Sequence, residues 1–335
     1  MPSASLPLQI AGLGKFLPER VVTNAELEQA LGLREGWIAR MTGVLERRRA
    51  ESGASTAAMA AAAARQALER AGRRIEDIDL IVGASSGPEQ LIPCTAALVQ
   101  RALGAPEGKS ACFDICATCL SFPVALQLIA PLLASGVYKT ALVFSSEMTA
   151  HSLNPAEPES ATLLGDAAAA AILVQTPPGE ASRLHHTAFE THASRGAELT
   201  RFRGGGSRRH PNDPATTPEM NLFEMQGPPV LLLALQLMPL FTEQFFANAG
   251  IGVESLDLVV PHQASGRGIS LVASRSGLPR EKFFINLPVR GNCIAASIPL
   301  ALCEAWEAGQ LERGHRILLA GTGAGLTLGA ALLTF

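Results

Sequence analysis

The strongest constraint on the fold is an internal repeat. Residues 75–83 (IEDIDLIVG) and residues 253–261 (VESLDLVVP) share an acidic turn followed by a short apolar run, 178 positions apart in a chain of 335 residues. Each copy follows a helix-like stretch, at residues 55–73 and 230–250, and each apolar run is typical of a strand that is buried on both faces. A spacing of half the chain indicates two similar halves.

The pattern that follows each copy is also shared. Residues 126–134 and 141–144 in the first half correspond to residues 298–308 and 317–320 in the second, in each case a helix followed by a buried strand. Strands that alternate with helices predict a parallel or mixed sheet with helices on both faces. We therefore expect a duplicated α/β fold, with one half at residues 1–175 and the other at residues 176–335.

The segment between the halves, residues 176–218, is rich in loop-forming residues and carries the basic cluster Arg208-Arg209-His210. We interpret it as a solvated surface loop. Contact of the basic cluster with an acidic partner is the alternative.

Composition excludes several classes of protein. Hydrophobic residues make up 47% of the chain and charged residues 17%, which is enough apolar material for a large core. The formal charge of −3 provides no global field for nucleic acid or an anionic membrane. We see no secretory signal, and the longest apolar run, residues 230–241, is shorter than a membrane span. We therefore expect a soluble, cytoplasmic protein that neither binds nucleic acid nor inserts into a membrane.

The segment most suggestive of chemistry is residues 111–126, ACFDICATCLSFPVAL. An apolar strand is expected to end near Cys116, and a helix to begin at Cys119 with Pro123 in its first turn. A thiol at a helix N-terminus lies at the positive end of the helix dipole, which favours the nucleophilic thiolate. Cys112 and Cys116 are expected on the strand, as small buried hydrophobic residues.

The same cysteines allow a second interpretation. The spacing Cys112-x3-Cys116-x2-Cys119 is that of radical S-adenosylmethionine enzymes, which bind a four-iron cluster through three cysteines. That motif needs a loop that can wrap the cluster, whereas residues 113–115 have the pattern of a buried strand. A structural zinc site would need a fourth ligand at metal spacing, and the sequence has none there. We expect neither a metal nor a cofactor.

Two polar residues lie at the ends of predicted elements in the second half. His262 follows the strand of the second repeat copy, at the carboxyl end where ligands collect in open α/β sheets. Asn292 follows Gly291 before a helix rich in small residues, where its amide could donate into a cleft or simply cap the helix. Residues 321–325 (GTGAG) follow a strand, and such glycines let backbone N–H groups approach a ligand oxygen.

Taken together, these segments resemble the β-ketoacyl-acyl-carrier-protein synthase III family, a branch of the thiolase-like condensing enzymes. The resemblance extends over nearly the whole chain, through GWIARMTGVLERR, FDICATC, LLGDAAAAAIL, VPHQASGR, GNCIAASIP and GTGAGLTLGAALL in family order. It implies a thiolase-like duplicated five-layer α/β/α/β/α sandwich, usually homodimeric. This agrees with the repeat.

The resemblance also implies roles for individual residues. Cys119 matches the nucleophile that accepts the acyl group, and His262 and Asn292 match the pair that hydrogen-bonds the thioester oxygen of the second substrate. The backbone N–H groups of Cys119 and Ala324 match the oxyanion hole. The implied substrates are acyl-thioesters of an acyl carrier protein or of coenzyme A.

The expected carrier-binding residues are Trp37, Arg40, His151, Arg267 and Arg275. Trp37 matches an aromatic residue that stacks on the adenine of coenzyme A in the family. The two arginines that hold this adenine in the family are replaced by Met41 and His151 in this sequence. Pro228 replaces an asparagine that lies along the pantetheine arm in the family. We therefore expect weak binding of coenzyme A and docking of an acidic carrier protein on Arg267 and Arg275.

Our leading hypothesis is an acyltransferase that forms a Cys119 acyl-enzyme and condenses it with a malonyl-type thioester, with loss of CO₂, in fatty acid or secondary-metabolite biosynthesis. A second hypothesis is transfer of the acyl group from Cys119 to an oxygen or nitrogen nucleophile. A third is a non-catalytic partner subunit. The radical iron–sulfur protein is the fourth.

Overall fold

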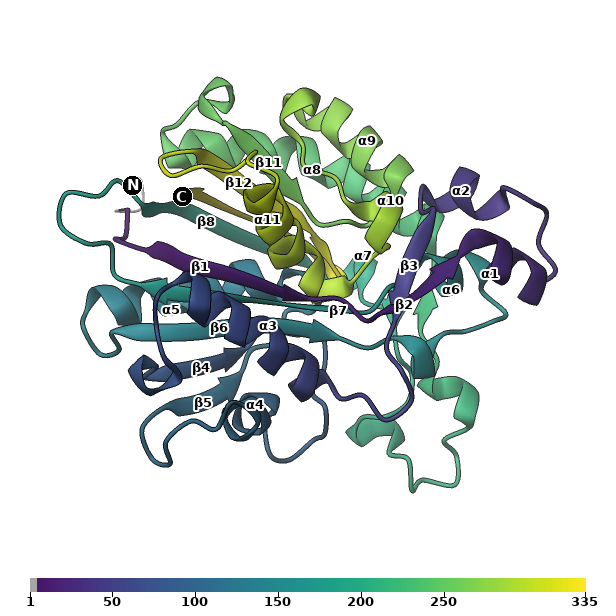
Figure 1. The fold of residues 1–335 in the computed structure, drawn as a ribbon. Helices are drawn as coiled ribbons and strands as arrows, with labels where there is room; N and C mark the ends of the chain where they lie inside the picture. The colour runs from purple at the N-terminus through teal and green to yellow at the C-terminus, as the bar shows by residue number, and fades with distance from the viewer. Residues whose placement is uncertain (1–4) are drawn as a thin grey trace.

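The computed structural model describes residues 5–335 and contains two mixed sheets, one from each half of the sequence (Figure 1). The first sheet has the order β1-β7-β6-β4-β5 and the second has the order β8-β13-β12-β11 when read from the corresponding edge. The strands of the first sheet are β1 (Gln9–Phe16), β4 (Leu80–Gly83), β5 (Ala111–Asp114), β6 (Thr140–Glu147) and β7 (Ala167–Val174). Those of the second are β8 (Arg183–His192), β11 (Leu258–Pro261), β12 (Arg316–Gly323) and β13 (Gly325–Thr334).

The strand orders confirm the duplication that the repeat predicts. The repeat copies form β4 and β11. Within its own half, each lies parallel to a later strand, β4 to β6 and β11 to β12. A parallel bridge between Val259 and Phe283 takes the place that β5 has beside β4. The predicted thiolase-like fold class is therefore correct.

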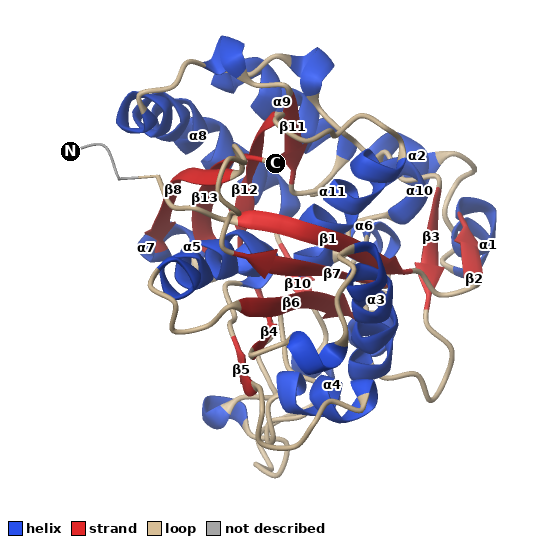
Figure 2. Cartoon of the chain, turned by 60° about the vertical axis from the view of Figure 1, so that its left-hand side comes forward, coloured by secondary structure: helices blue, strands red, loops and turns tan. Residues whose placement is uncertain are grey.

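Helices complete five layers, which Figure 2 shows from the side. Helices α3 (Thr56–Arg70) and α4 (Thr95–Leu103) cover the outer face of the first sheet, and α8 (Gly227–Ala249) packs on the outer face of the second with α9 (Gly266–Ser276) beside it. Helices α5 (Ser121–Ala134) and α11 (Ser297–Glu307) lie between the two sheets. The main core is this central layer, where buried residues of both sheets meet those of α5 and α11.

The remaining elements are short. They are β2 (Arg20–Thr23) paired with β3 (Glu46–Arg49), β9 (Thr200–Arg201) paired with β10 (Glu224–Met225), and helices α1 (Asn24–Ala30), α2 (Trp37–Thr42), α6 (Pro158–Leu163), α7 (Ala193–Gly196) and α10 (Leu287–Arg290). Eight 3₁₀ turns complete the described elements, of which η2 (Thr118–Leu120), η3 (Ala150–Ser152) and η8 (Ile294–Ala296) matter below.

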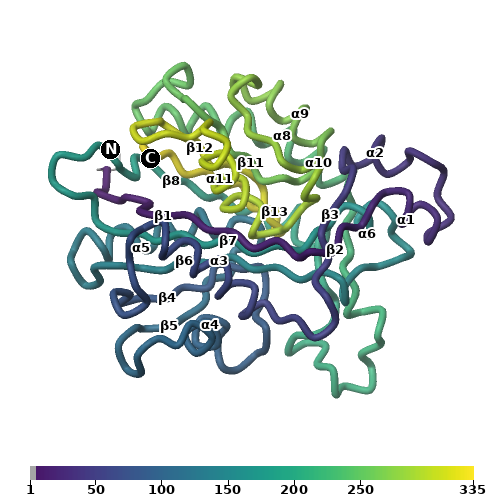
Figure 3. Tube along the Cα trace, viewed as in Figure 1, coloured from purple at the N-terminus to yellow at the C-terminus, as the bar shows by residue number. Residues whose placement is uncertain are grey.

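The connection between the halves is more ordered than the sequence suggests. Its first part, β8, is a ten-residue strand at the edge of the second sheet, paired antiparallel with β13. The interpretation of residues 176–218 as a solvated loop is therefore wrong for β8. In the tube of Figure 3 this strand lies beside the other strands of the second sheet.

Among residues 5–335, one helix is long and apolar enough to cross a membrane, by length and composition only. This is α8, which contacts β8, β13 and α9. About a third of its apolar window (33%) is buried in these contacts, while Leu232 and Leu240 are exposed.

Candidate active site

Cys119 lies in η2, the tight turn that leads directly into α5. Thr118, just before it, has a left-handed backbone (φ 50°), as does Ile294 (φ 48°) at the start of η8 in the second half. The end of β12 presses on the Cys119 turn, because a Cβ at Gly323 would lie 2.6 Å from the Thr118 Oγ1 atom. Glycine is therefore required at this point of the GTGAG segment.

The backbone N–H groups of Cys119 and Ala324 both act to lower the pKa of the Cys119 thiol. These are the two groups that the resemblance assigns to the oxyanion hole. Burial raises the pKa of the Cys119 thiol to about 12, and the negative charge of Glu147 adds to the increase. The expectation of a thiolate at neutral pH is therefore wrong, since burial outweighs the N–H groups at the start of the helix.

Glu147 is a site residue that sequence reasoning missed. It ends β6, is buried, and accepts hydrogen bonds from the Ser86 N–H (2.7 Å) and the Ser86 hydroxyl (2.5 Å), while the Ala295 N–H also acts to lower its pKa. Burial raises its pKa to about 7 although these hydrogen bonds favour the carboxylate. The only sequence signal is a charged residue that closes the otherwise uncharged strand TALVFSSE.

His262 follows β11, as predicted, and its backbone N–H donates to the Ala320 carbonyl of β12 (2.8 Å). Its side chain is buried, and a Cβ at Gly321 would lie 2.5 Å from the His262 Cβ, so this glycine makes room for the histidine. Burial lowers the pKa of His262 to about 4, which keeps the imidazole neutral. Its Nδ1 atom has no hydrogen-bond partner among residues 5–335.

Asn292 is held with its amide in a defined orientation. Its Oδ1 accepts from the Ile294 N–H (2.8 Å), so the NH₂ group is left as a donor, and its Nδ2 lies 3.4 Å from the Ala264 carbonyl. Ala264 is two residues from His262 on the same loop. The contact therefore joins the loop after β11 to the η8 turn.

These segments meet at one place between the two halves. The η2 turn contacts both η8 and β12, and β11 pairs with β12. The fold thus brings together the segments that carry Cys119, His262, Asn292 and Ala324.

The other two cysteines of the segment differ in their surroundings, and Cys116 lies near Cys119. Cys112 is on β5, where burial raises its thiol pKa to about 11, whereas Cys116 follows the strand, is exposed, and contacts the Ser86 carbonyl (3.3 Å). The expectation that Cys116 is a buried strand residue is therefore wrong. No group of three metal-binding side chains occurs among the described residues, and the geometry does not support the iron–sulfur interpretation.

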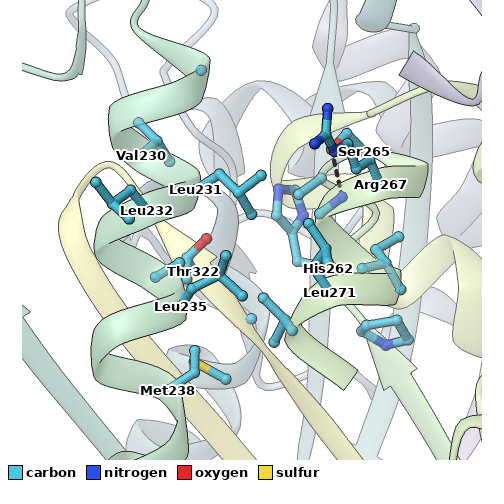
Figure 4. Close-up of a pocket in the computed structure, with 18 of the residues that line it drawn as sticks. Val230, Leu231, Leu232, Leu235, Met238, His262, Ser265, Arg267, Leu271 and Thr322 are labelled. Carbon is cyan, nitrogen blue, oxygen red and sulfur yellow. Dashed lines mark hydrogen bonds between the residues drawn. The ribbon is translucent and has the colours of Figure 1, made fainter. Parts of the chain in front are cut away.

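A cavity of about 440 Å³ opens beside His262, between α8 and α9 (Figure 4). Of the five expected carrier-binding residues, Arg40 of α2 and Arg267 of α9 line it, as does Met41. Trp37 begins α2, and the exposed His151 and Arg275 lie in η3 and α9, but none of these three lines the cavity.

The fold and the arrangement of Cys119, His262 and Asn292 define a thiolase-like condensing enzyme. Residues 113–193 match the family described as 3-Oxoacyl-[acyl-carrier-protein (ACP)] synthase III, and residues 246–335 match its C-terminal part. The β-ketoacyl-[acyl-carrier-protein] synthase III of Symbiobacterium thermophilum is 37% identical over 328 residues, which cover 98% of each chain. That of Syntrophomonas wolfei is 34% identical over 328 residues, 98% of this chain and 97% of the relative.

A solved structure agrees with these sequence matches. The 3-oxoacyl-[acyl-carrier-protein] synthase III from Aquifex aeolicus VF5 has a TM-score of 0.86 and 33% identity, covering 99% of this chain and 100% of that chain. The chain belongs to the 3-oxoacyl-[acyl-carrier-protein] synthase III family. The predicted family, fold class and class of enzyme, an acyltransferase, are therefore confirmed.

Proposed function

We propose that this enzyme forms an acyl-thioester on Cys119 and condenses it with a malonyl-type thioester, with loss of CO₂. The observation that carries the proposal is the position of Cys119 in the turn before α5, where its own backbone N–H and that of Ala324 both act to lower the pKa of its thiol. Backbone donors beside the nucleophile are available to the oxyanion that forms on the attacked carbonyl.

In the first half-reaction the acyl group moves from the carrier's sulfur to the Cys119 sulfur. The Cys119 thiol is protonated at neutral pH because its pKa is about 12, so its proton must leave as the new C–S bond forms. The released carrier thiolate takes up one proton, and no net charge is produced. The N–H groups of Cys119 and Ala324 stabilise the tetrahedral oxyanion between the two thioesters.

In the second half-reaction His262 and Asn292 act on the acceptor thioester. Loss of CO₂ leaves negative charge on the thioester oxygen, and the two donors stabilise that enolate in a site with little water. A neutral His262 suits this role, because it can donate one N–H without carrying a charge. The carbanion attacks the Cys119 thioester, and the products are a 3-oxoacyl-thioester, CO₂ and free Cys119.

The test is a two-substrate assay. Enzyme acylated on Cys119 is mixed with a malonyl-thioester, and intact mass, CO₂ and the 3-oxoacyl product are followed. Equal amounts of CO₂ and 3-oxoacyl product support the proposal. Transfer of the acyl group to an alcohol or amine with no CO₂ would replace it with the oxygen- or nitrogen-acylating function.

We also propose that the enzyme is a cytoplasmic homodimer that pairs through the β5 edge of the first sheet. β5 ends that sheet with an unpaired edge, and Phe113 on it is exposed. The neighbouring loop exposes Leu91 (76%) and Ile92 (85%), and such apolar groups at a sheet edge are typical of an interface. Sedimentation of the wild type and of Phe113→Asp tests this, and a monomeric wild type would contradict it.

A further inference from the structure

The cavity beside His262 has a polar mouth and an apolar interior. Charged side chains lie only at the mouth, from Arg40, Glu159 and Arg267. Further in, α8 contributes Ala234, Leu235 and Met238 and α9 contributes Leu271 and Val272, and Figure 4 shows leucine side chains of the two helices facing each other across the space. The volume of about 440 Å³ is within the range of sites that bind small molecules.

The cavity belongs to one side of the active site. His262 lines it, together with Gly321 and Thr322 at the end of β12, whereas neither Cys119 nor Asn292 does. We therefore do not expect the cavity to hold an acyl chain attached to Cys119. Its expected occupant is a group on the second substrate, whose thioester His262 contacts.

The interior also does not suit the arm of an acyl carrier. Such an arm carries amide groups, which need hydrogen-bond partners when buried. The cavity offers these in Arg40, Ser265 and Arg267, whereas the Thr322 hydroxyl beside Leu235 is followed inward by the apolar side chains of Ala234, Met238 and Val272. The interior is suited to an unbranched hydrocarbon chain.

We propose that the second substrate is a 2-alkylmalonyl thioester whose alkyl chain lies in the cavity between α8 and α9. This rests on the proposed function and names its acceptor substrate. The α-carbon loses CO₂ and attacks the acyl carbonyl on Cys119, and the Cys119 sulfur leaves and takes up one proton. The product is a 2-alkyl-3-oxoacyl thioester on the carrier, with no oxidant or further reactant needed.

Two features of the helices shape the cavity. Gly268 on α9 lies against the Ser265 hydroxyl that caps the helix, since a Cβ there would lie 2.8 Å from the Ser265 Oγ and 3.9 Å from the Leu231 Cδ1 of α8, so the absence of a side chain lets the two helices approach. At the far end Met238 and Leu278 separate the cavity from a small void of about 10 Å³ lined by phenylalanines. Methionine is flexible, so this end can adjust to chains of different length.

The kinetic test compares two acceptors on the same carrier, malonyl and 2-hexylmalonyl. We expect the wild type to use the 2-hexylmalonyl thioester with a kcat/KM at least equal to that for the malonyl thioester. Ala234→Phe and Val272→Phe enlarge side chains that line the cavity and should shift the ratio of the two kcat/KM values by about tenfold or more toward malonyl. Leu240→Phe, on the exposed side of α8 and outside the cavity lining, is the matched control and should leave the ratio unchanged.

A wild type that condenses malonyl but not 2-hexylmalonyl thioester would overturn the inference and leave the proposed function standing. A binding measurement tests the inference separately from the proposed function, because it does not require condensation. In Cys119→Ala, 2-alkylmalonyl amide analogues with methyl, butyl and hexyl chains should bind with affinities that rise about fourfold per added methylene. Ala234→Phe should flatten this series. Affinities independent of chain length in the unfilled cavity would overturn the inference whether or not condensation is observed.

Discussion

Glu147 is buried close enough to Cys119 for its negative charge to raise the pKa of the thiol. The carboxylate accepts hydrogen bonds from the N–H and hydroxyl groups of Ser86, in the turn after β4, and the N–H of Ala295 in η8 also acts to lower its pKa. Two opposing effects therefore act on the pKa of the Cys119 thiol: nearby N–H groups lower it, whereas burial and the Glu147 carboxylate raise it. Burial and the carboxylate have the larger effect, so the thiol of the free enzyme is protonated at neutral pH.

The first prediction follows from this pair. Glu147→Gln removes the negative charge, so the pKa of Cys119 should fall and its alkylation by iodoacetamide at pH 8 should accelerate, by about tenfold for each unit of decrease. The pKa of Glu147 is about 7, so the wild type also loses this charge as the pH falls below 7, and the two rates should converge there. Rates measured by intact mass between pH 6 and pH 9 test this. Glu107→Gln, an exposed carboxylate, is the control, and parallel curves for Glu147→Gln and wild type would contradict the prediction.

The second prediction concerns which cysteine is acylated. Cys119→Ala should gain no acyl mass from an acyl-thioester and should lose condensation by roughly a thousandfold or more. Cys116→Ala removes the exposed thiol of the same segment and should behave as the wild type. Peptide mapping after acyl-thioester treatment locates the acyl group, and acylation of the Cys119→Ala variant would refute the mechanism.

The third prediction separates the two half-reactions. Asn292→Ala and His262→Ala should each keep most self-acylation but reduce CO₂ release from a malonyl-thioester by about a hundredfold or more, because each removes one donor to the enolate oxygen. The buried, neutral His262 has a pKa of about 4, so CO₂ release should show no loss of activity from protonation of His262 between pH 7 and pH 5. Acyl mass and CO₂ are measured on the same samples. An acylation defect as large as the decarboxylation defect would argue against this division.

The duplication could be predicted because the repeat, a local pattern, places β4 and β11. Local pattern also places Cys119, His262 and Asn292 at the ends of strands or the starts of helices, but the roles expected of His262 and Asn292 come from the family resemblance. The protonation states could not be predicted in this way. They depend on burial and on Glu147, which is 28 residues from Cys119 and is brought to it only by the packing of β6 against β4.

Two glycines show another feature that sequence spacing alone does not predict. Gly12 and Gly14 near the N-terminus match part of the spacing of a nucleotide-binding loop, but both lie on β1 and pack against α3. A Cβ at Gly12 would lie 2.4 Å from the Ala67 carbonyl oxygen of that helix. They permit close packing of a helix on a sheet. Sequence spacing alone does not distinguish this use from a ligand-binding one.

The fourth prediction tests whether Gly321 makes room for His262. Gly321→Ala places a Cβ 2.5 Å from the His262 Cβ, so the histidine must move. A displacement of this kind should lower CO₂ release by about a hundredfold while acylation of Cys119 continues, and should destabilise the fold by about 1–3 kcal/mol. Gly206→Ala is the control, because a Cβ there meets no atom within 4 Å. Thermal unfolding and CO₂ release are measured for both, and a fully active Gly321→Ala would show that the histidine has room to spare.

The last prediction concerns the carrier. Arg40 and Arg267 lie at the cavity mouth and offer positive charge to an acidic carrier protein. Met41 lines the same mouth at a position where the family resemblance implies an arginine. The site therefore lacks a second planar cation that could stack on the adenine of coenzyme A. We expect carrier-protein thioesters to be used with a higher kcat/KM than the same acyl group on coenzyme A. Arg267→Glu should lower kcat/KM for the carrier-protein substrate selectively, by about tenfold at low salt and less at high salt, because screening weakens the attraction. Arg101→Glu, an exposed arginine on α4, is the control. Equal or better use of the coenzyme A thioester, or a loss of activity with Arg267→Glu that is the same for both donors, would show that the mouth does not recognise a carrier protein.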